Sequence, residues 1–496
     1  MKLKIIITSI LFSNLLISQS QESTFDNISV EGLKQDLAIL KENLEAIHAG
    51  LYTYTPKSAM DSFFLQVEKE ITTPLTPVDF YRRILPLNNL IRNGHTLIIP
   101  PESWSQYVAT AAVHLPFDIF TSNDRIFILR NFTNNKNIKE GDELISIDGI
   151  DTKEILDELI QSANKDGYNH TFPLVLINQD FSEYFANVIA TKPEYTIKLK
   201  QNNEVAEYKI QCKTIEEIRT IAKRKYQFDK LPWYGGIENP PLEYEVLDKT
   251  ALLRLPTFSI YNIKDTGIDY KTFFKNAFTD IDQKNIQSLI IDLRGNGGGH
   301  ADVGLELFSY LYDKPVRLFK DMHAITRTIP DKEYYLGSSL WQYFMMKLAL
   351  KKVNKTKFTP RIWAAKMNKL TLVEKEPSAP IFNGDVYVLI DGWVFSASAM
   401  FSALIKNTNR GIFIGEETGG NPKIQIGDFE QMLTLPNSGL RMRIPLFYEE
   451  MDVDFPNPKR GIVPDIHKRN DITQEIAKED SVLNWVISKI ESDLEK

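Results

Sequence analysis

The stretch LIIDLRGNGGGH, residues 289–300, runs from apolar residues through a charged pair into three successive glycines. A glycine-rich turn after a strand can cradle a phosphate, bend the chain, or aim bare N–H groups at a reacting oxygen. A P-loop needs Lys-Ser/Thr after its last glycine, and His300-Ala301 follows here. A dinucleotide fingerprint needs its third glycine where His300 stands. The turn therefore favours neither kind of nucleotide site.

A second junction between a strand and a helix carries serines. The apolar run VYVLIDG ends at Gly392, and WVFSASAMFSALI then begins a helix that packs serine and alanine at its start. Serine at a helix N-terminus is most often a cap, so the run alone does not identify a nucleophile. In an acyl-transfer site, however, this is where a nucleophilic serine would meet bare N–H groups.

A serine nucleophile also needs a base, because its protonated hydroxyl is a weak nucleophile. Of the seven histidines, His95 follows an Asn-Gly turn, where a rigid loop can present an imidazole. His300, at the end of the glycine-rich stretch, is a second and less favoured base. Taken alone, His95 could equally be a surface histidine without a function.

The residues around these motifs alternate between strands and helices. Short continuous apolar runs lie at 250–258, 288–294, 385–392 and 411–417. Such runs are expected of parallel strands in a sheet that helices cover on both faces. Residues 245–470 are therefore predicted to form an α/β domain. Its insertion, 326–381, is either a lid or an ordinary surface excursion.

Two regions with other residue patterns precede this domain in the sequence. Apolar residues recur at intervals of three and four through much of 28–104, which predicts a helical N-terminal domain carrying His95. Residues 105–212 contain short strands between Asn/Asp/Gly turns. Within them IKEGDELISIDGIDTKEILDELI, 138–160, resembles the strand, Asp-Gly turn and helix of PDZ domains, which bind an extended peptide end. A generic β-turn-β-helix unit is the alternative.

The sequence thus predicts a multidomain α+β protein. Its segments are a signal peptide (1–20), the helical domain (28–104), a PDZ-like β-rich domain (105–212), a linker (213–244), the α/β domain (245–470) and a C-terminal helix (471–496). The signal peptide is inferred from a basic start, an apolar run and small residues at the cut, Ser18 and Ser20. A transmembrane helix is the alternative, but the run is short and interrupted by Ser and Asn. We expect export to the periplasm or the outside medium, with no membrane span after signal removal.

The composition limits the kinds of molecule that this protein is expected to bind. The formal net charge of -7 becomes -9 once Lys2 and Lys4 leave with the signal peptide (-7 minus 2), which argues against a nucleic-acid partner. The single cysteine, Cys212, excludes intrachain disulfides and a lipid anchor at the cleavage point. No His/Cys/Glu cluster has metal-ligand spacing, so neither a metal nor a cofactor is expected. The oligomeric state is left open.

The motifs together carry a family resemblance. DLRGNGGG, VLIDGWVFSASAMF, GIFIGEETGG and RGIVPDI occur in this order, with NGHT far upstream and the PDZ-like unit between. This arrangement resembles the C-terminal processing peptidase and tricorn family of serine peptidases, over nearly all of the mature chain. The resemblance implies a ClpP/crotonase-like catalytic domain. It places the nucleophile on Ser396, with Ser398 as the nearest competitor. The implied oxyanion donors are the N–H groups of Ala397 and Gly298, with Gly299 as neighbour.

The family uses two kinds of base. One branch has a lysine in Gly-Lys-Gly soon after Gly-Glu-x-Thr, but GEETGGNP puts Asn421 there, and only Lys423 could substitute. The tricorn-like branch uses a histidine from the N-terminal part, which His95 matches. That branch also has a serine before the histidine and a glutamate before Gly-x-x-Pro-Asp. This chain has Gly94 and Pro458 at those places.

The acid that would orient His95 therefore stays open between Asp454, Asp452 and Glu450. The resemblance implies a serine peptidase that hydrolyses peptide bonds of proteins or peptides through an acyl-enzyme and trims C-terminal tails. The PDZ-like unit would dock an extended or C-terminal segment of the substrate. The alternative is a catalytically inactive peptide-binding scaffold on the same fold.

Overall fold

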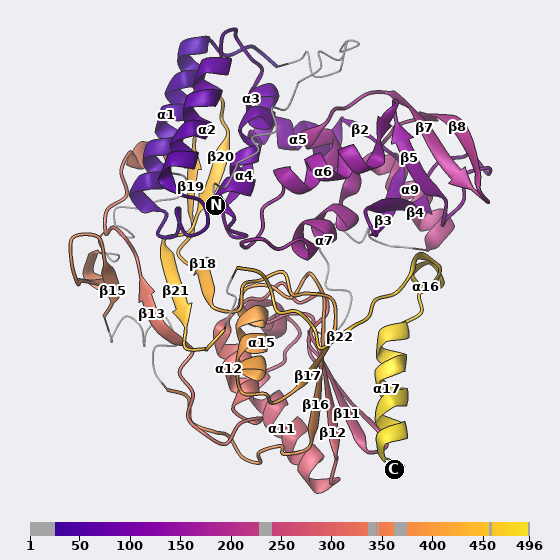
Figure 1. The fold of residues 1–496 in the computed structure, drawn as a ribbon, viewed down its shortest axis with the longest axis vertical. Coiled ribbons are helices and arrows are strands. Elements are labelled where there is room, and N and C mark those ends of the chain that lie inside the picture. Colours follow the sequence, from indigo (N-terminus) through magenta and orange to yellow (C-terminus); the bar gives the residue numbers. More distant parts are fainter. Residues whose placement is uncertain are drawn as a thin grey trace, which may run out of the picture.

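A six-stranded sheet forms the core of the α/β domain in the computed structural model of this chain (Figure 1). The structure describes residues 25–227, 241–335, 344, 347–361, 374–455 and 459–494. The first two strands of the sheet pair antiparallel, and each later pair is parallel. In order across the sheet the strands are β10 (Glu243–Leu247), β11 (Thr250–Arg254), β12 (Ser288–Asp292), β16 (Asp385–Ile390), β17 (Ile412–Gly415) and β22 (Ile466–His467).

Helices cover both faces of this sheet, as the continuous apolar runs predicted. Along β12, Ile291 joins one core and Ile290 the opposite one, because successive side chains of a strand point to opposite faces. The Ile291 face is covered by α11 (Tyr270–Gln283), α12 (Ala301–Phe308) and α15 (Ala397–Asn407). The other face packs against α17 (Ser481–Leu494), which follows the short α16 (Ile472–Ala477). The glycine-rich turn and the serine junction thus follow adjacent strands, β12 and β16.

The PDZ-like region is a six-stranded antiparallel sheet with helices. It contains the predicted strand, Asp148-Gly149 turn and helix, as β5, β6 and α6. The strands in sheet order are β3 (Phe117–Ser122), β4 (Arg125–Asn131), β5 (Glu143–Ile147), β7 (Glu194–Gln201) and β8 (Glu204–Gln211), and β6 (Ile150–Asp151) pairs with β5. The helices are α6 (Thr152–Ser162), α7 (Thr171–Gln179) and α8 (Phe181–Val188).

Half of the predicted linker is packed structure. β2 (Val113–His114) pairs with β9 (Lys213–Thr214), and α9 (Ile215–Tyr226) begins at a capping box that Thr214 forms with Glu217. Ile218 and Ile221 of α9 pack on Phe132, at the end of β4. This segment therefore continues the PDZ-like region. The Gly/Pro-rich part, 228–240, lies outside the described residues, as does the predicted signal peptide.

The N-terminal domain is helical up to the loop that carries His95. Its elements are α1 (Val30–Ile47), α2 (Lys57–Glu70), α3 (Pro77–Ile84), α4 (Pro86–Ile91), β1 (Leu97–Ile99) and α5 (Glu102–Thr110). Ser29 caps α1 by accepting a hydrogen bond from the Gly32 N–H at 3.1 Å. Along α1, Leu33, Leu37 and Leu40 are buried, so the spacing that predicted the helix is also its packing face.

Strands from the end of the α/β domain complete the helical domain, which the sequence did not reveal. β1 is the outer strand of a sheet with order β1-β20-β19, and Ile98 pairs with Met442. A second small sheet has the order β13-β21-β18. These strands are β13 (Phe319–His323), β18 (Ile424–Gly427), β19 (Gln431–Thr434), β20 (Arg441–Ile444) and β21 (Phe447–Met451). Figure 1 shows the two sheets linking the upper and lower parts of the molecule.

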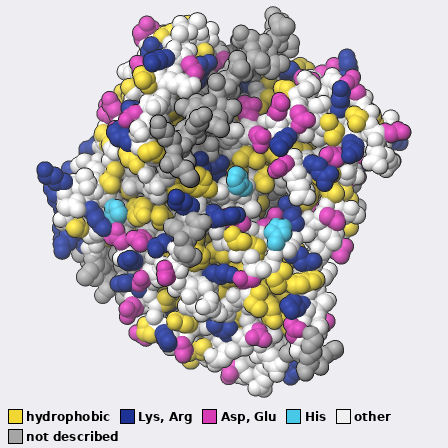
Figure 2. All heavy atoms as spheres, in the orientation of Figure 1, with side chains coloured by type: hydrophobic (Ala, Val, Ile, Leu, Met, Phe, Trp, Pro, Cys, Tyr) yellow, Lys and Arg dark blue, Asp and Glu magenta, His cyan; other side chains and the backbone are white. Residues whose placement is uncertain are grey.

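The predicted insertion is described only in part. It contains the short helix η2 (Lys332–Tyr334) and a hairpin of β14 (Leu350–Lys352) and β15 (Phe358–Pro360). Residues 336–343, 345–346 and 362–373 lie outside the described part, so neither interpretation of the insertion is tested. None of the helices in the described ranges is both long and apolar enough to cross a membrane. Acidic and basic side chains are interspersed over the face drawn in Figure 2.

The β19–β20 hairpin is fastened to α1 by Asp36, which is fully buried. Its carboxylate accepts hydrogen bonds from the backbone N–H of Asn437 at 3.1 Å and of Ser438 at 2.7 Å, and from the Ser438 hydroxyl at 2.5 Å. Asp36→Ala should lower the free energy of unfolding by about 3 kcal/mol, because it leaves buried donors without acceptors. Glu42→Ala, at an exposed position of the same helix, should change it by less than about 0.5 kcal/mol. Equal shifts of the two urea midpoints would contradict this account of the hairpin.

Candidate active site

Ser396 lies at the junction of β16 and α15, in a backbone conformation that is strained for serine. It is the N-terminal flanking residue of α15, with φ 53° and ψ -125°. A residue with a side chain avoids positive φ, and holding it there costs about 1–3 kcal/mol. Such strain persists only when the surroundings enforce it, and it is concentrated at functional sites. The structure therefore holds Ser396 in one orientation at the start of the helix.

The glycine-rich turn and the serine junction form one hydrogen-bonded unit. Asn296 is fully buried, and its carbonyl oxygen accepts hydrogen bonds from the Phe395 N–H at 3.2 Å and from the Ser398 hydroxyl at 2.6 Å. The Ser398 oxygen also accepts from the Phe395 N–H at 3.0 Å. Ser398 is completely buried and structural, whereas Ser396 lines the neighbouring cavity. Of the two serines considered from the sequence, only Ser396 is placed to meet a substrate.

The charged pair in DLRG anchors the turn from outside. The Arg294 guanidinium donates hydrogen bonds to both carboxylates, Asp292 and Asp480, each with a shortest distance of 2.7 Å. On the other side, Asp391 at the end of β16 accepts from the Gly295 N–H at 3.0 Å. Burial raises the pKa of Asp391 to about 7. These contacts explain why charged residues accompany the glycines.

Gly298 differs from its predicted role. Its N–H donates to the Asn296 side-chain oxygen at 2.9 Å, so it is engaged within the turn rather than directed at the cavity. A Cβ at this position would lie 2.6 Å from the Phe395 carbonyl oxygen and 3.0 Å from the Ala397 nitrogen, and φ is +99°. Gly299 and Ala397, the other two predicted donors, both line the cavity beside Ser396. The glycine at 298 is needed for close approach, and Gly299 and Ala397 stay candidates for the oxyanion donors.

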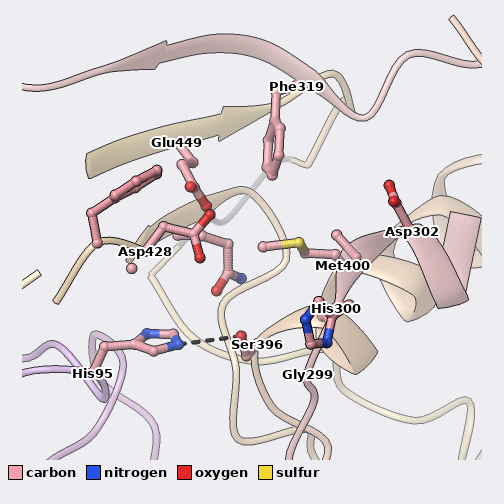
Figure 3. A pocket seen from close by; sticks show the side chains of 14 residues that line it. His95, Gly299, His300, Asp302, Phe319, Ser396, Met400, Asp428 and Glu449 are labelled. Atoms are coloured by element: carbon pink, nitrogen blue, oxygen red, sulfur yellow. Dashed lines mark hydrogen bonds between the residues drawn. The ribbon is translucent and has the colours of Figure 1, made fainter. Parts of the chain in front are cut away.

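His95 meets Ser396 across the boundary between domains. Its Nε2 lies 3.2 Å from the Ser396 Oγ, although the two residues are 301 positions apart (Figure 3). This distance is within hydrogen-bond reach. Burial, and then the positive charge of Arg443, lower the pKa of His95 to about 4. The imidazole is therefore neutral at pH 7, which is the state a base requires.

Backbone contacts fix the loop that carries His95. The Gly94 N–H donates to the Asp166 carboxylate at 2.7 Å, and the Asn93 side chain donates to the Ile426 carbonyl at 3.0 Å. The guanidinium of Arg443 donates to the His95 carbonyl at 2.9 Å. The histidine is thus positioned by its own backbone and by strand β20.

Nothing in the sequence indicated the role of Asp166, and Asn421 was apparent only as the residue at the place of the lysine. Asp166 is buried on the PDZ side, and its second oxygen accepts from the Asn421 N–H at 3.1 Å. It therefore links the His95 loop to the segment after Gly-Glu-x-Thr. Asn421 stands where the other family branch has its lysine, and its side chain donates to the Tyr54 hydroxyl at 2.9 Å. The Asp166 carboxylate could not be found by motif, because an isolated Asp in a PDZ-like helix–loop region carries no pattern.

Steric crowding explains why a glycine, and not a serine, precedes His95. A Cβ at Gly94 would lie 2.3 Å from Cζ of Phe395, so a serine does not fit there. The Phe395 ring lies 4.8 Å from the His95 ring, and it stacks on Phe172 of α7 at 4.5 Å. An aromatic side chain next to the nucleophile thus fills the place of the missing serine, and it extends the contact to the PDZ-like region.

None of the three acids proposed to orient His95 does so in this structure. Asp452 pairs with Arg317 at 2.7 Å, and Glu450 lies 3.7 Å from Lys320. The Asp454 backbone N–H donates to the Asn407 side chain at 2.8 Å, and no hydrogen bond joins its carboxylate to His95. The Nδ1 atom of His95 is buried and has no hydrogen-bond partner among the residues that the structure describes. The sequence suggested an acid by analogy, and the packing supplies none.

The other histidine near the turn faces the same cavity. His300 lines it together with Ser396, and the His300 Nδ1 accepts a hydrogen bond from the Ile260 N–H at 3.2 Å. Its ring stacks edge-on against Tyr261. His95, and not His300, makes the hydrogen bond to the Ser396 hydroxyl.

Comparison with known proteins identifies two regions of the chain. Residues 249–468 match the model of peptidase family S41, and residues 111–222 match a PDZ domain. Its α/β domain belongs to peptidase family S41. The chain is a serine-type peptidase with a PDZ domain, as the resemblance in its motifs predicted.

Solved structures share the fold of this S41 peptidase. Mature CPAF complexed with lactacystin is similar with a TM-score of 0.63 and 16% identity, over 94% of this chain and 99% of that one. Mature CPAF alone is similar with a TM-score of 0.59 and 16% identity, over 91% and 99% of the two chains. Among curated protein sequences, no relative matches the chain. At these identities the likeness concerns the fold.

Substitution of Gly298 tests the close approach at the turn. Gly298→Ala should lower kcat/KM for peptide cleavage at least about 100-fold, because its Cβ would press on the Ala397 nitrogen and on Phe395. Gly297→Ala is the matched control, since a Cβ there meets nothing within 4 Å. It should retain activity within about threefold, as expected of a substitution that disturbs no contact. Equal losses in the two variants would contradict the claim that close approach requires glycine at 298.

The pKa of His95 predicts the acid limb of the pH profile. The base is active when neutral, so activity falls as pH drops through its pKa, near 4 here and not near 6.5. Labelling rates with a serine-directed fluorophosphonate between pH 3.5 and 8 would measure this limb. Arg443→Gln removes the positive charge that disfavours imidazolium, so it should move the limb to higher pH. A limb near 6.5 in the wild type, or a shift to lower pH in the variant, would contradict the assignment.

Proposed function

We propose that Ser396 is the nucleophile of this peptidase and His95 its base. The observation that supports this is the 3.2 Å contact between His95 Nε2 and Ser396 Oγ. Nε2 would take the hydroxyl proton as Oγ attacks the peptide carbonyl, and would then donate it to the leaving amine. Water would hydrolyse the resulting acyl-enzyme by the same proton transfers in reverse order.

The oxyanion is assigned to the N–H groups of Ala397 and Gly299. Ala397 is the first residue of α15, where backbone N–H groups have no partner within the helix and the helix dipole favours negative charge. Gly299, within the glycine-rich turn, lines the same cavity as Ser396 and Ala397. Two such donors stabilise the tetrahedral intermediate more than the ground state, which is what lowers the barrier.

His95 would work without a carboxylate partner. When Nε2 accepts the serine proton, Nδ1 must already carry one, and no carboxylate among the described residues receives it. Asp166 acts one step away, through the backbone of Gly94. The orientation of the ring is then due to the loop and to the Phe395 ring, and a mobile side-chain acid is not required.

We further propose that the protein is exported and acts on protein or peptide substrates, trimming C-terminal tails. The N-terminal sequence, with its basic start and short apolar run, supports export. The PDZ domain supports recognition of a chain end. Its β3 is an edge strand of the sheet, and α7 packs beside it. At the Thr121 N–H this edge is already occupied by the Asn178 side chain at 2.9 Å, so a docked peptide would pair with the remaining strand positions.

The test of Ser396 is covalent labelling. The purified full-length protein is mixed with a fluorophosphonate, and its intact mass is recorded. We expect one adduct on the wild type and none on Ser396→Ala. His95→Gln should slow labelling by about 100-fold or more, the contribution typical of a positioned base. His300→Asn is the matched control, and it should label at the wild-type rate.

The labelling results distinguish an active serine peptidase from an inactive peptide-binding scaffold. An unmodified wild-type mass would favour the inactive peptide-binding scaffold. An adduct that survives Ser396→Ala would place the nucleophile elsewhere, and slow labelling of His300→Asn would move the base to His300. Cleaved termini compared between cells with wild-type and Ser396→Ala protein would then reveal whether the products are shortened at their C-terminal ends.

A further inference from the structure

A cavity of 380 Å³ opens beside Ser396, and most of its wall has no part in the proposed chemistry. Ser396, His95 and Ala397 form one end of it. The far end contains the carboxyl groups of Asp428 and Glu449 (Figure 3). A second cavity, of 630 Å³, also borders the Ser396–His95 pair, but it extends toward Arg443 and aromatic residues of the PDZ region. The second cavity is lined by Asp428, Glu430 and Arg443, whereas the first has carboxylates and no lysine or arginine among its described lining residues.

The acidic end of the first cavity is built by two paired strands. Gln425 of β18 is the cross-strand partner of Glu449 of β21, so their side chains share a face. Both residues are 1% exposed. Asp428 follows β18 directly, at the exposed mouth of the same face. This end of the cavity is part of the sheet that joins the two domains, and it is not a loop cluster.

The buried oxygens at this end lack donors. Oε1 of Gln425 and Oε1 of Glu449 are both buried without a hydrogen-bond partner among the described residues. The amide nitrogen of Gln425 is already used, since it donates to the Asn421 carbonyl, which leaves the oxygen facing the cavity. Native proteins seldom leave buried acceptors unsatisfied, so each such atom calls for an explanation. Because the neutral amide oxygen of Gln425 lacks a partner as the carboxylate oxygen of Glu449 does, the site lacks a hydrogen-bond donor and is more than a cluster of acids.

The charge of the cavity selects the kind of donor. Among the described residues that line it, the carboxylates are Asp302, Asp428 and Glu449, and no lysine or arginine is present. His300 lines the same cavity, and its positive charge when protonated acts on Asp428, but one imidazole does not balance three carboxylates. Burial, then the negative charge of Asp428 and a hydrogen bond between the two carboxyl groups, raise the pKa of Glu449 well above its ordinary value. Oε1 of Glu449 is the oxygen that this contact leaves without a partner among the described residues. A cation placed between the two carboxyl groups would remove that repulsion.

We infer that this cavity binds a lysine or arginine side chain of the substrate, next to the bond that is cleaved. A lysine ammonium has three N–H donors and no acceptor, which suits the oxygens of Gln425, Glu449 and Asp428. Met400 lies between Ser396 and the acidic end and would contact the methylene stem, and Phe319 lines the cavity above it (Figure 3). This inference deepens the proposed function and rests on Ser396 as the point of cleavage.

Binding to the inactive Ser396→Ala protein tests the cavity without relying on catalysis. Two peptide libraries, acetyl-X-X-X-Lys-X-X-amide and acetyl-X-X-X-norleucine-X-X-amide, are passed over the immobilised full-length variant, and retention is measured by mass spectrometry. Norleucine keeps the stem of lysine and lacks the charge. We expect retention of the lysine library to be at least about tenfold stronger, the effect of a charge-assisted hydrogen bond.

The carboxyl groups are tested by isosteric amides in the same background. Asp428→Asn with Glu449→Gln should abolish the preference for lysine, and Asp428→Asn alone, at the exposed mouth, should reduce it even if the double variant folds poorly. Glu450→Gln is the matched control. It is the next residue on β21, on the opposite face, with Lys320 at 3.7 Å, and it should retain the full preference.

Equal retention, or no retention, of the two libraries would overturn the inference, as would a preference that survives Asp428→Asn and Glu449→Gln. Cleavage of a denatured protein by the wild type gives an independent readout, with lysine or arginine expected at one fixed position beside the cleaved bonds. Fluorophosphonate labelling of Ser396 reports on the proposed function separately. Normal labelling with no preference for lysine means that only the inference fails, whereas a preference for lysine without labelling means that only the proposed nucleophile fails.

Discussion

The contact between His95 and Ser396 is the constraint on which the rest of the architecture depends. Each residue is rigid within its own domain: Ser396 by a strained backbone at the start of α15, and His95 by a loop whose backbone is hydrogen-bonded on both sides. Neither domain contains a complete site, so the 3.2 Å distance is set by how the domains are joined. The pairing of β1 with β20, together with the Asp36 contacts to the same hairpin, is what joins them. On the proposed roles of Ser396 and His95, stability and catalysis are therefore coupled through a sheet that contains neither residue.

The sequence predicted those parts of the structure in which a local pattern determines the outcome. The apolar runs around Ile290 predicted the parallel sheet, and the Asp148-Gly149 turn predicted part of the PDZ region, because both patterns depend on neighbouring residues alone. The hairpin around Ser438 was missed, since its strands are short and its partner lies some 400 residues upstream in α1. Asp166 was missed for a similar reason: a lone carboxylate acquires its role only when two distant loops meet.

The site residues also divide into those that a local pattern predicted and those that depend on tertiary packing. The sequence singled out Ser396 and His95, which the structure places together, through a turn and a helix start that are local features. It assigned the oxyanion to Gly298 by analogy, but the Asn296 side chain takes that N–H, a detail of side-chain packing that spacing cannot reveal. The acid expected near His95 was an analogy too. Phe395 explains the departure at Gly94, because a large ring and a second side chain cannot occupy one space.

The joining of β1 to β20 also orders events during synthesis. A ribosome makes the chain from its N-terminus, and domains generally fold as they emerge. His95 and its helices appear first, yet the strand that pairs with β1 ends at Ile444, long after Ser396 has been made. A nascent chain that stops short of this strand holds both reactive residues but lacks the sheet that brings them together. On the proposed roles of Ser396 and His95, the active site can therefore form only after nine-tenths of the chain has been made, about when Ile444 has left the ribosome.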